Sequence, residues 1–191
     1  MRVRFPLPAQ QFKFYFIMLT IEQEKWIAHL SDKNKIRIVK FDSTADEKFK
    51  KVKLRIQDVL GKRVVVEHRG ATSLRISGQD EIDVYIPVSP ARFNSMIDPL
   101  KRIFGGPRSL YPLERARFVT EEDGKHVDVF LMNKECDGWK NGVKFEEYLK
   151  SHPKVLKDYQ KLKENGNGLS VQEYYRRKIE FINSILDKAI K

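Results

Sequence analysis

The chain has 191 residues, of which 41% are hydrophobic and 33% are charged, a size and composition that suit one globular domain with its own core. The formal net charge of +11 favours polyanionic partners such as nucleic acid or nucleotide phosphates, although a lysine-rich solvated surface explains it equally well. Cys136 is the single cysteine, which excludes an intramolecular disulfide and argues against a cysteine-based zinc site.

The start of the chain does not resemble a targeting segment. It lacks the long apolar stretch and the small-residue cleavage site of a signal peptide. Met18 is a credible alternative start, so we expect residues 1–17 to be an N-terminal extension without chemistry of its own and residues 18–191 to form a single domain. No apolar run approaches the roughly 20 residues of a membrane span. We therefore expect a cytoplasmic protein with no membrane partner.

The first predicted elements are two helices joined by an extended segment. Thr20 and Gln23 have the spacing of a capping box, which predicts a helix over 21–30. Residues 36–39 suit either a short strand or an extended link. A second helix over 45–60, closed by a glycine, is predicted because its apolar residues recur at helical spacing. These residues are Phe49, Val52, Ile56, Val59 and Leu60.

The stretch 64–88 carries the residues that suggest chemistry. The β-branched residues Val64–Val66 predict a strand that ends at a glycine turn, 70–73. This turn is small and rich in hydroxyl groups, so its backbone can approach a ligand and offer N–H groups to phosphate oxygens. Glu81 and Asp83 then alternate with aliphatic residues, which predicts a strand with both carboxylates on one face.

A third carboxylate follows a helix and a hairpin. An amphipathic helix over 90–104 is predicted to kink or split at Pro99. Residues 116–121 and 126–132 then form a predicted hairpin around the four residues between them. If its second arm lies beside the earlier acidic strand, Asp128 becomes a third carboxylate on the same face. Three carboxylates beside a phosphate-binding turn predict a site for Mg²⁺ and a nucleoside triphosphate.

The last part of the chain is predicted to be helical, from about residue 142 to the end. A proline marks the boundary between its first two helices, and Asn165–Gly168 separates the second from the third. The predicted helices cover 143–150, 153–164 and the residues from Ser170 onward. We expect the sheet core, about 40–135, and the helical part, about 142–191, to enclose a cleft with the acidic residues on its floor.

Several of these motifs resemble one family when they are taken in order. The glycine turn, the acid-x-acid strand and an acid between two hydrophobic residues resemble the nucleotidyltransferase superfamily, whose fold is shared with polymerase beta and the aminoglycoside nucleotidyltransferases. The closer resemblance is to its GrpB-like family, and it covers roughly Lys40 to the C-terminus. The residues that carry it are His68–Ser73, Phe145–Pro153, Tyr159, Leu162, Lys163, Tyr174 and Lys178–Ile182.

The resemblance implies an α/β (α+β) fold, with a mixed or largely antiparallel sheet flanked by helices and followed by C-terminal helices. It implies metal-dependent transfer of a nucleoside monophosphate from a nucleoside triphosphate to an acceptor, which is an RNA or a small molecule. The expected catalytic and metal-binding residues, with Mg²⁺ (or Mn²⁺) as the cofactor, are Asp83, Asp128 and Glu81. The expected nucleotide-binding residues are Gly70, Thr72, Ser73, Arg69, Arg117 and His68.

The sequence departs from this family in two ways, and other functions stay open. Asp80-Glu81 replaces a common Lys-Pro and Asp128 replaces a frequent histidine, which adds acidic residues and favours an enzyme. Leu74-Arg75-Ile76 replaces the usual Val-Pro-Gly, which favours the alternative of a nucleotide- or RNA-binding module without catalysis. A non-specific nucleic-acid binder is a third possibility, with affinity that falls steeply with salt and ignores Asp83.

Overall fold

The computed structural model describes residues 19–189, so the expected extension over 1–17 and the alternative start at Met18 lie outside the described residues. The described strands are β1 (Glu67–Arg69), β2 (Glu81–Val88), β3 (Ser109–Tyr111), β4 (Arg115–Glu122) and β5 (Lys125–Asn133). The described helices are α1 (Ile21–Ala28), α2 (Ala45–Leu60), α3 (Gly70–Ser73), α4 (Pro90–Phe104), α5 (Asp137–Ser151), α6 (Pro153–Asn165) and α7 (Val171–Ala189).

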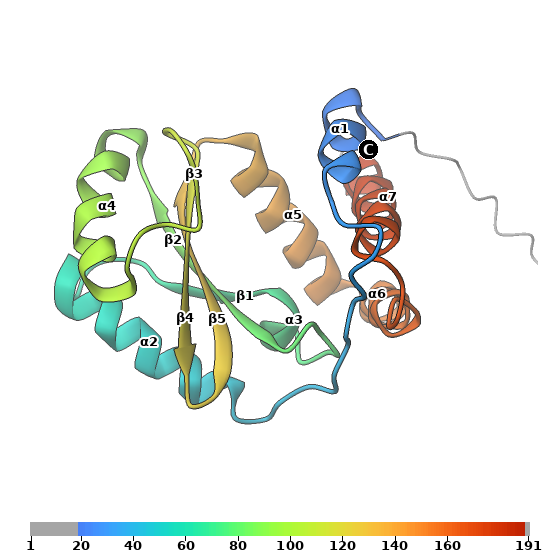
Figure 1. The fold of residues 1–191 in the computed structure, drawn as a ribbon, viewed down its shortest axis with the longest axis horizontal. Helices are drawn as coiled ribbons and strands as arrows, with labels where there is room; N and C mark the ends of the chain where they lie inside the picture. Colours follow the sequence, from blue (N-terminus) through green and yellow to red (C-terminus); the bar gives the residue numbers. More distant parts are fainter. Residues whose placement is uncertain (1–18, 190–191) are drawn as a thin grey trace, which may run out of the picture.

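The strands form one mixed sheet in the order β1-β2-β5-β4-β3 (Figure 1). Only the central pair, β2 and β5, is parallel among the described strands, and the other three pairs are antiparallel. The parallel pair requires a crossover, which α4 and the β3–β4 segment provide. The fold therefore confirms the expected mixed α/β architecture.

The β4–β5 hairpin is set by its two-residue turn. Asp123 and Gly124 both have positive φ angles, 48° and 73°, as a type I′ turn requires. This turn places Glu122 opposite Lys125 and fixes the register of both arms. The arms are slightly longer than the sequence predicted, because pairing continues up to the two turn residues.

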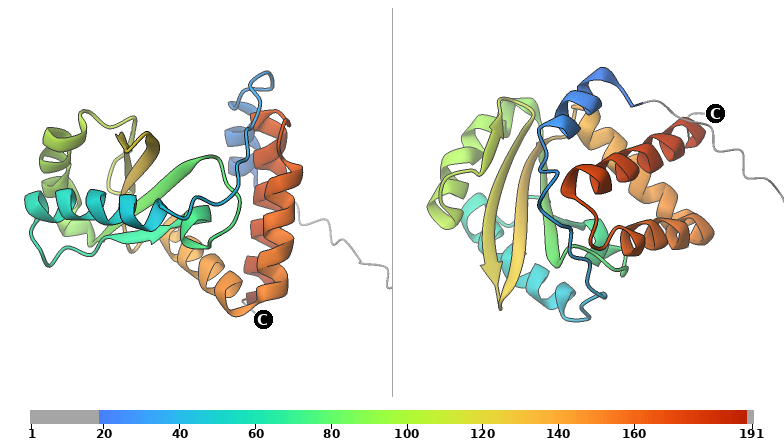
Figure 2. Two further views of the ribbon diagram at one scale, coloured as in Figure 1. Left: turned by 90° about the horizontal axis from the view of Figure 1, so that it is seen from below. Right: turned by 45° about the vertical axis from the view of Figure 1, so that its right-hand side comes forward.

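One face of the sheet carries the main hydrophobic core. Residues of β2 alternate strictly between buried and half-buried, and the buried set packs against α2 and α4. These two helices lie on the opposite side of the sheet from α5, α6 and α7 (Figure 2). The main core contains the fully buried residues Val52, Ile56, Ile82, Val84, Ile86, Phe93, Leu100, Phe118, Val127, Val129 and Leu131.

A second, smaller core joins the helical part to the segment around α3. It consists of Ile76, Phe145, Leu149, Tyr159 and Ile185, with partly buried residues packed around them. The segment before α2 crosses between the two parts as an extended link and forms two isolated bridges, Lys35 with Ser170 and Val39 with Gly78. The link therefore connects residues of the last helical region to the loop that precedes β2.

The structure corrects the sequence prediction for the first strand and the glycine turn. Val64–Val66 precede β1, because pairing with β2 starts only at Glu67, but Val64 and Val66 are still buried in the core. The turn 70–73 is a single helical turn, α3, whose residues pack beside β1 and β2.

Three helices also differ from the prediction. Pro99 neither splits nor ends α4, because the buried residues on both sides of it, Ile97 and Leu100, hold the helix against the sheet. Helix α5 begins at Asp137, six residues earlier than the expected Val143. The first helix ends at Ala28, slightly before the expected boundary.

None of the helices between residues 19 and 189 combines the length and apolar character needed to cross a bilayer.

Candidate functional site

The acidic residues of the two parallel strands lie on one face of the sheet. In the β2–β5 register, Asp83 is the partner of Asp128 and Glu81 is the partner of His126. Residues opposite one another in a sheet point to the same face. The expected condition, that the third carboxylate lies on the same face beside the acidic strand, is therefore met. This face looks away from α2 and α4.

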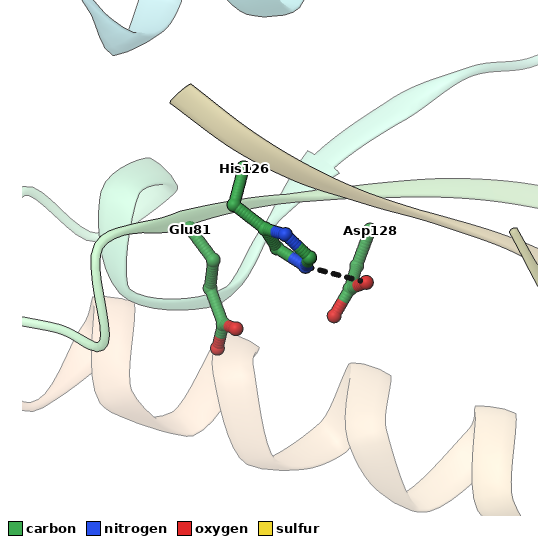
Figure 3. A group of neighbouring side chains, drawn as sticks. All are labelled: Glu81, His126 and Asp128. Atoms are coloured by element: carbon green, nitrogen blue, oxygen red, sulfur yellow. Dashed lines mark hydrogen bonds and ion pairs between the residues drawn. The ribbon is translucent and has the colours of Figure 1, made fainter. Parts of the chain in front are cut away.

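His126 joins this group, although the sequence analysis did not single it out. One ligand atom from each of Glu81, His126 and Asp128 lies within 4.8 Å of the other two. All three side chains project to the same side of their strands, and His126 Nε2 lies 3.1 Å from Asp128 Oδ1 (Figure 3). The signal was present in the sequence, because His126 precedes Asp128 by two residues and the period of a strand places both on one face.

Asp83 lies next to this group in an unfavourable environment for a negative charge. Burial, and then the neighbouring Glu81, raise the pKa of Asp83 to about 7, while Lys178 opposes the shift and Asp128 adds to it. The negative charges of Glu81 and Asp128 thus add to the cost of ionising Asp83 at this position. A divalent cation would offset this charge, so the donor set of carboxylates and one imidazole fits such an ion.

Asp128 already interacts with a cation of the chain. It is buried, with 4% of its surface exposed, and Arg117 Nε donates a hydrogen bond of 2.9 Å to its Oδ1. The pKa of Arg117 is raised, because the ion pair with Asp128 outweighs the opposing effect of partial burial. The guanidinium thus fixes the position of the Asp128 carboxylate. Arg117 lines the cleft, as expected of a nucleotide-binding residue, but its ion-pair partner in the structure is the Asp128 carboxylate.

Gly70 allows the close approach between α3 and Asp83. Its φ angle is +76°, and a Cβ atom built at this position would lie 2.0 Å from Asp83 Oδ2. Any side chain here would collide with the carboxylate. Glycine is therefore needed because Asp83 occupies the space beside it, a requirement that the sequence alone did not reveal.

His68 and Thr72 form a hydrogen-bonded chain with a residue of α2. His68 Nδ1 lies 3.2 Å from Asp46 Oδ1, and its Nε2 lies 2.9 Å from Thr72 Oγ1. Burial lowers the pKa of His68, which favours the neutral ring. The carboxylate of Asp46 only accepts hydrogen bonds, so we assign the ring proton of His68 to Nδ1. The Thr72 hydroxyl then donates a hydrogen bond to Nε2 of His68. In this arrangement the Thr72 hydroxyl hydrogen is directed at His68.

Ser73 and Arg69 contact Glu146 of α5. Ser73 Oγ lies 3.1 Å from Glu146 Oε1, and Arg69 forms an ion pair of 3.1 Å with Glu146 Oε2. Arg69 also pairs with Glu67 at 3.0 Å and donates a hydrogen bond to the carbonyl of Gly142. These contacts connect the first strand and α3 to the helical part.

The cleft between the sheet and the helical part has a volume of about 560 Å³. Of the residues predicted from the sequence, it is lined by Glu81, Asp83, Asp128, Gly70, Arg69 and Arg117. The side chains of His68, Thr72 and Ser73 are not among its lining residues, because their polar groups are directed at neighbouring parts of the protein. The structure therefore brings the three expected acidic residues together in the cleft. The two expected hydroxyl residues, Thr72 and Ser73, do not line it.

Aromatic side chains line the cleft beyond the acidic residues. Tyr85 stacks on Phe130 with a centroid separation of 4.7 Å, and Trp139 lies 6.0 Å from Tyr85. Arg69 lies 5.0 Å from the ring centroid of Trp139. Arg115 also lines this end, and its buried Nε has no hydrogen-bond partner among the described residues. The cleft floor thus changes along the strands from carboxylates to aromatic rings.

Comparisons with known proteins agree on one family. A family model described as GrpB protein matches residues 35–188. The UPF0157 protein YqkA of Bacillus subtilis (strain 168) is 24% identical over 170 residues, which cover 85% of this chain and 50% of that protein. The chain therefore spans about half the length of this curated relative.

A solved structure supports the same fold. The crystal structure of conserved protein GrpB from Enterococcus faecalis matches with a TM-score of 0.61 at 19% identity. The match covers 80% of this chain and 96% of that chain. At this identity the likeness concerns the fold.

Proposed function

The chain belongs to the GrpB family, and from this we propose that it is a metal-dependent nucleotidyltransferase. It moves a nucleoside monophosphate from a nucleoside triphosphate to a hydroxyl or phosphate of an acceptor, which is an RNA or a small molecule. The observation that supports this proposal most strongly is the parallel register of β2 and β5, which pairs Asp83 with Asp128 beside Gly70.

The carboxylates suit this chemistry because nucleotidyl transfer depends on positioning and on neutralising charge. Glu81, Asp83 and Asp128 would hold Mg²⁺ or Mn²⁺, and His126 adds an imidazole ligand, which suits Mn²⁺ better than Mg²⁺. The bound cation would neutralise charge on the phosphate oxygens.

The residues of the chain then assist one exchange of bonds. The acceptor oxygen forms a bond to the α-phosphorus, and the bond from that phosphorus to the leaving pyrophosphate breaks. Asp128, which Arg117 holds in position on the cleft floor, is the proposed acceptor for the proton of the acceptor hydroxyl. Backbone N–H groups beside Gly70 are the proposed contacts for the phosphate oxygens at the sheet side of the cleft.

Asp83→Asn provides the test. We expect this variant to lose metal-dependent binding of a non-hydrolysable nucleoside triphosphate, measured by titration calorimetry with Mg²⁺ and with Mn²⁺. The thermal melting temperature should stay close to that of the wild type, since the Asp83 carboxyl has a pKa of about 7 and the amide has nearly the same shape.

The matched control is Asp98→Asn on α4. Asp98 is exposed, with 81% of its side chain accessible, and it pairs only with Lys101 among the described residues. This variant should bind the triphosphate like the wild type. Equal binding by Asp83→Asn and the wild type would reject the assigned site.

A second candidate function is a nucleotide- or RNA-binding module without catalysis. The ion pair between Arg117 and Asp128 favours it, since a protein cation already satisfies one of the expected metal ligands. Release of pyrophosphate from a panel of nucleoside triphosphates separates the two functions. Release that Asp83→Asn abolishes supports the enzyme, whereas tight binding of triphosphate without any release supports the binding module.

A further inference from the structure

The helical side of the cleft holds two lysines that the sequence analysis did not assign to the site. Lys178 of α7 lines the cleft, and Lys163 of α6 lies behind it with 4% of its surface exposed. Lys163 Nζ lies 3.5 Å from Tyr174 Oη and 5.4 Å from the ring centroid of Tyr159. Lys178 Nζ lies 5.2 Å from the ring centroid of Tyr175. The two ammonium groups are thus surrounded by tyrosines.

Neither lysine has a carboxylate partner in the described part of the chain. No acidic oxygen of residues 19–189 forms an ion pair with either Nζ, although the two interact electrostatically with Asp83. The tyrosines do not replace such a partner, because burial raises the pKa of Tyr159 and Tyr174 and keeps their hydroxyl groups neutral. Burial and the neighbouring Lys178 accordingly lower the pKa of Lys163 to about 7.

A buried cation close to a half-buried one is costly unless an anion accompanies them. The negative charges that act electrostatically on Lys163 are those of Asp83 and Glu81. These are the same carboxylates that the proposed function assigns to a divalent cation. A cation bound there would neutralise them and leave the lysines facing no negative charge, so the loaded site lacks an anion on its helical side.

The other cations near the carboxylates are already paired. Arg69 pairs with Glu67 and Glu146, and Arg117 pairs with Asp128. Arg115 lies farther along the cleft, because its strand partner Met132 follows Asp128 by four residues. At about 3.3 Å per residue, this is about 13 Å from the carboxylates. Lys178 is therefore the cation best placed to meet an anion held over Asp83.

We propose that Lys178, supported by Lys163, binds the polyphosphate chain of the nucleotide from the helical side of the cleft. The phosphates would lie between the carboxylates of β2 and β5 on one side and the two ammonium groups on the other. This assignment rests on the proposed function and extends it, because it moves part of the phosphate site from the glycine turn to α6 and α7. It also explains why α7 carries a half-buried lysine on the side that lines the cleft.

Binding of inorganic tripolyphosphate in the presence of Mg²⁺ or Mn²⁺ tests this assignment. Tripolyphosphate has no base or ribose, so it reports on the phosphate contacts alone. We expect Lys178→Met to weaken its binding by about tenfold to a hundredfold, the effect of losing one charge-assisted hydrogen bond. Lys178→Arg keeps the charge and should retain most of the affinity. The measurement is titration calorimetry on the full chain.

Lys161→Met is the matched control, because Lys161 is exposed on the same helix as Lys163. Its affinity for tripolyphosphate should stay within about twofold of the wild type, as for other solvent-exposed charges. Tripolyphosphate binding by folded Lys178→Met that equals the wild type would overturn the assignment. If Lys178→Met lacks a cooperative melt, Lys163→Met decides: unchanged affinity in that variant contradicts the assignment, and weakened affinity supports it.

Two further measurements separate this inference from the proposed function. Binding of Mn²⁺ alone, without tripolyphosphate, should be no weaker in Lys178→Met than in the wild type, because the variant removes a positive charge near Asp83. A wild-type protein that binds neither Mn²⁺ nor tripolyphosphate contradicts the proposed function itself. Metal-dependent binding by the wild type that Lys178→Met leaves intact contradicts only the role of the lysines.

Discussion

Gly70 determines where the carboxylate of Asp83 lies. A Cβ atom at position 70 would overlap Asp83 Oδ2, and the backbone there has a positive φ angle. Gly124 has nearly the same φ angle, +73°, but a Cβ atom at that position would meet no atom within 4 Å. The two glycines therefore separate the effect of backbone conformation from the effect of a steric clash.

We expect Gly70→Ala to destabilise the protein more than Gly124→Ala. Both variants bear the cost of a positive φ angle, about 1 kcal/mol. In Gly70→Ala the free energy of unfolding should fall by a further 1–3 kcal/mol, roughly the effect of overpacking. This variant should also bind metal more weakly, because Asp83 has to move. Urea unfolding gives the two free energies. Equal losses in both variants would mean that Asp83 moves away freely.

Lys163 gives the protein a predicted dependence of stability on pH. Its pKa falls from 10.5 to about 7 in the folded state, so the unfolded chain binds more protons between these values. The free energy of unfolding attributable to this group therefore rises with pH through that window. Its destabilising effect is complete below about pH 7 and disappears above about pH 10.5.

Lys163→Met should accordingly be more stable than the wild type at pH 7.5, with an advantage that shrinks by pH 9.5. The expected change in the difference is on the order of 1–3 kcal/mol across these two pH units. Urea unfolding at both pH values, with Lys161→Met as the control, measures it. An advantage that is constant with pH would show that Lys163 keeps its ordinary pKa.

At the scale of elements, Glu146 connects α5 to the sheet. It is 6% exposed, and it contacts Arg69 of β1, Ser73 of α3 and Lys150 of its own helix. Removal of one partner of a buried ion pair leaves the other partner buried without compensation. When Glu146 is absent, Glu67 is the one ion-pair partner that Arg69 keeps among residues 19–189.

We expect Glu146→Ala to destabilise the protein by about 3 kcal/mol, the usual effect of breaking a buried ion pair. Glu147→Ala, which removes the exposed neighbouring carboxylate, should change stability by less than about 0.5 kcal/mol. Urea unfolding of the two variants gives the comparison. Similar losses in both would indicate that the contacts of Glu146 do not hold α5 in place.

The same helix shows why some element boundaries were missed. Helix α5 contains Gly138 and Gly142 in its first two turns, and glycine lowers helix propensity by about 1 kcal/mol relative to alanine. The sequence pattern therefore supports a helix only from Val143. In the structure Trp139, between these glycines, lies beside Tyr85 and Arg69, and this packing stabilises a helical segment that local propensity disfavours.

At the scale of the whole molecule, the cleft lies between two separate hydrophobic cores. One core joins the sheet to α2 and α4, and the other joins α3 to α5, α6 and α7. The face of the sheet that carries Asp83 and Asp128 belongs to neither core, so its polar side chains stay available to a ligand. The net charge of +11 surrounds this acidic floor with a field that attracts anions such as nucleotides.

The sequence determined the elements and the face on which the acidic residues lie. Alternation in β2 placed Glu81 and Asp83 on one face, and the motifs around residues 68–73 and 145–153 indicated the family. These properties are local, because the two-residue period of a strand and the order of motifs are both visible in one dimension.

Tertiary structure decided which groups meet. The register of β2 and β5 brought His126 to Glu81, and the hydrogen bonds of His68 engaged the hydroxyl of Thr72. The packing of α6 and α7 brought Lys178 to the cleft, with Lys163 close to it. Lys178 follows Asp83 by 95 residues in the chain. Such a contact depends on how distant elements pack, and no local pattern encodes the distance between them.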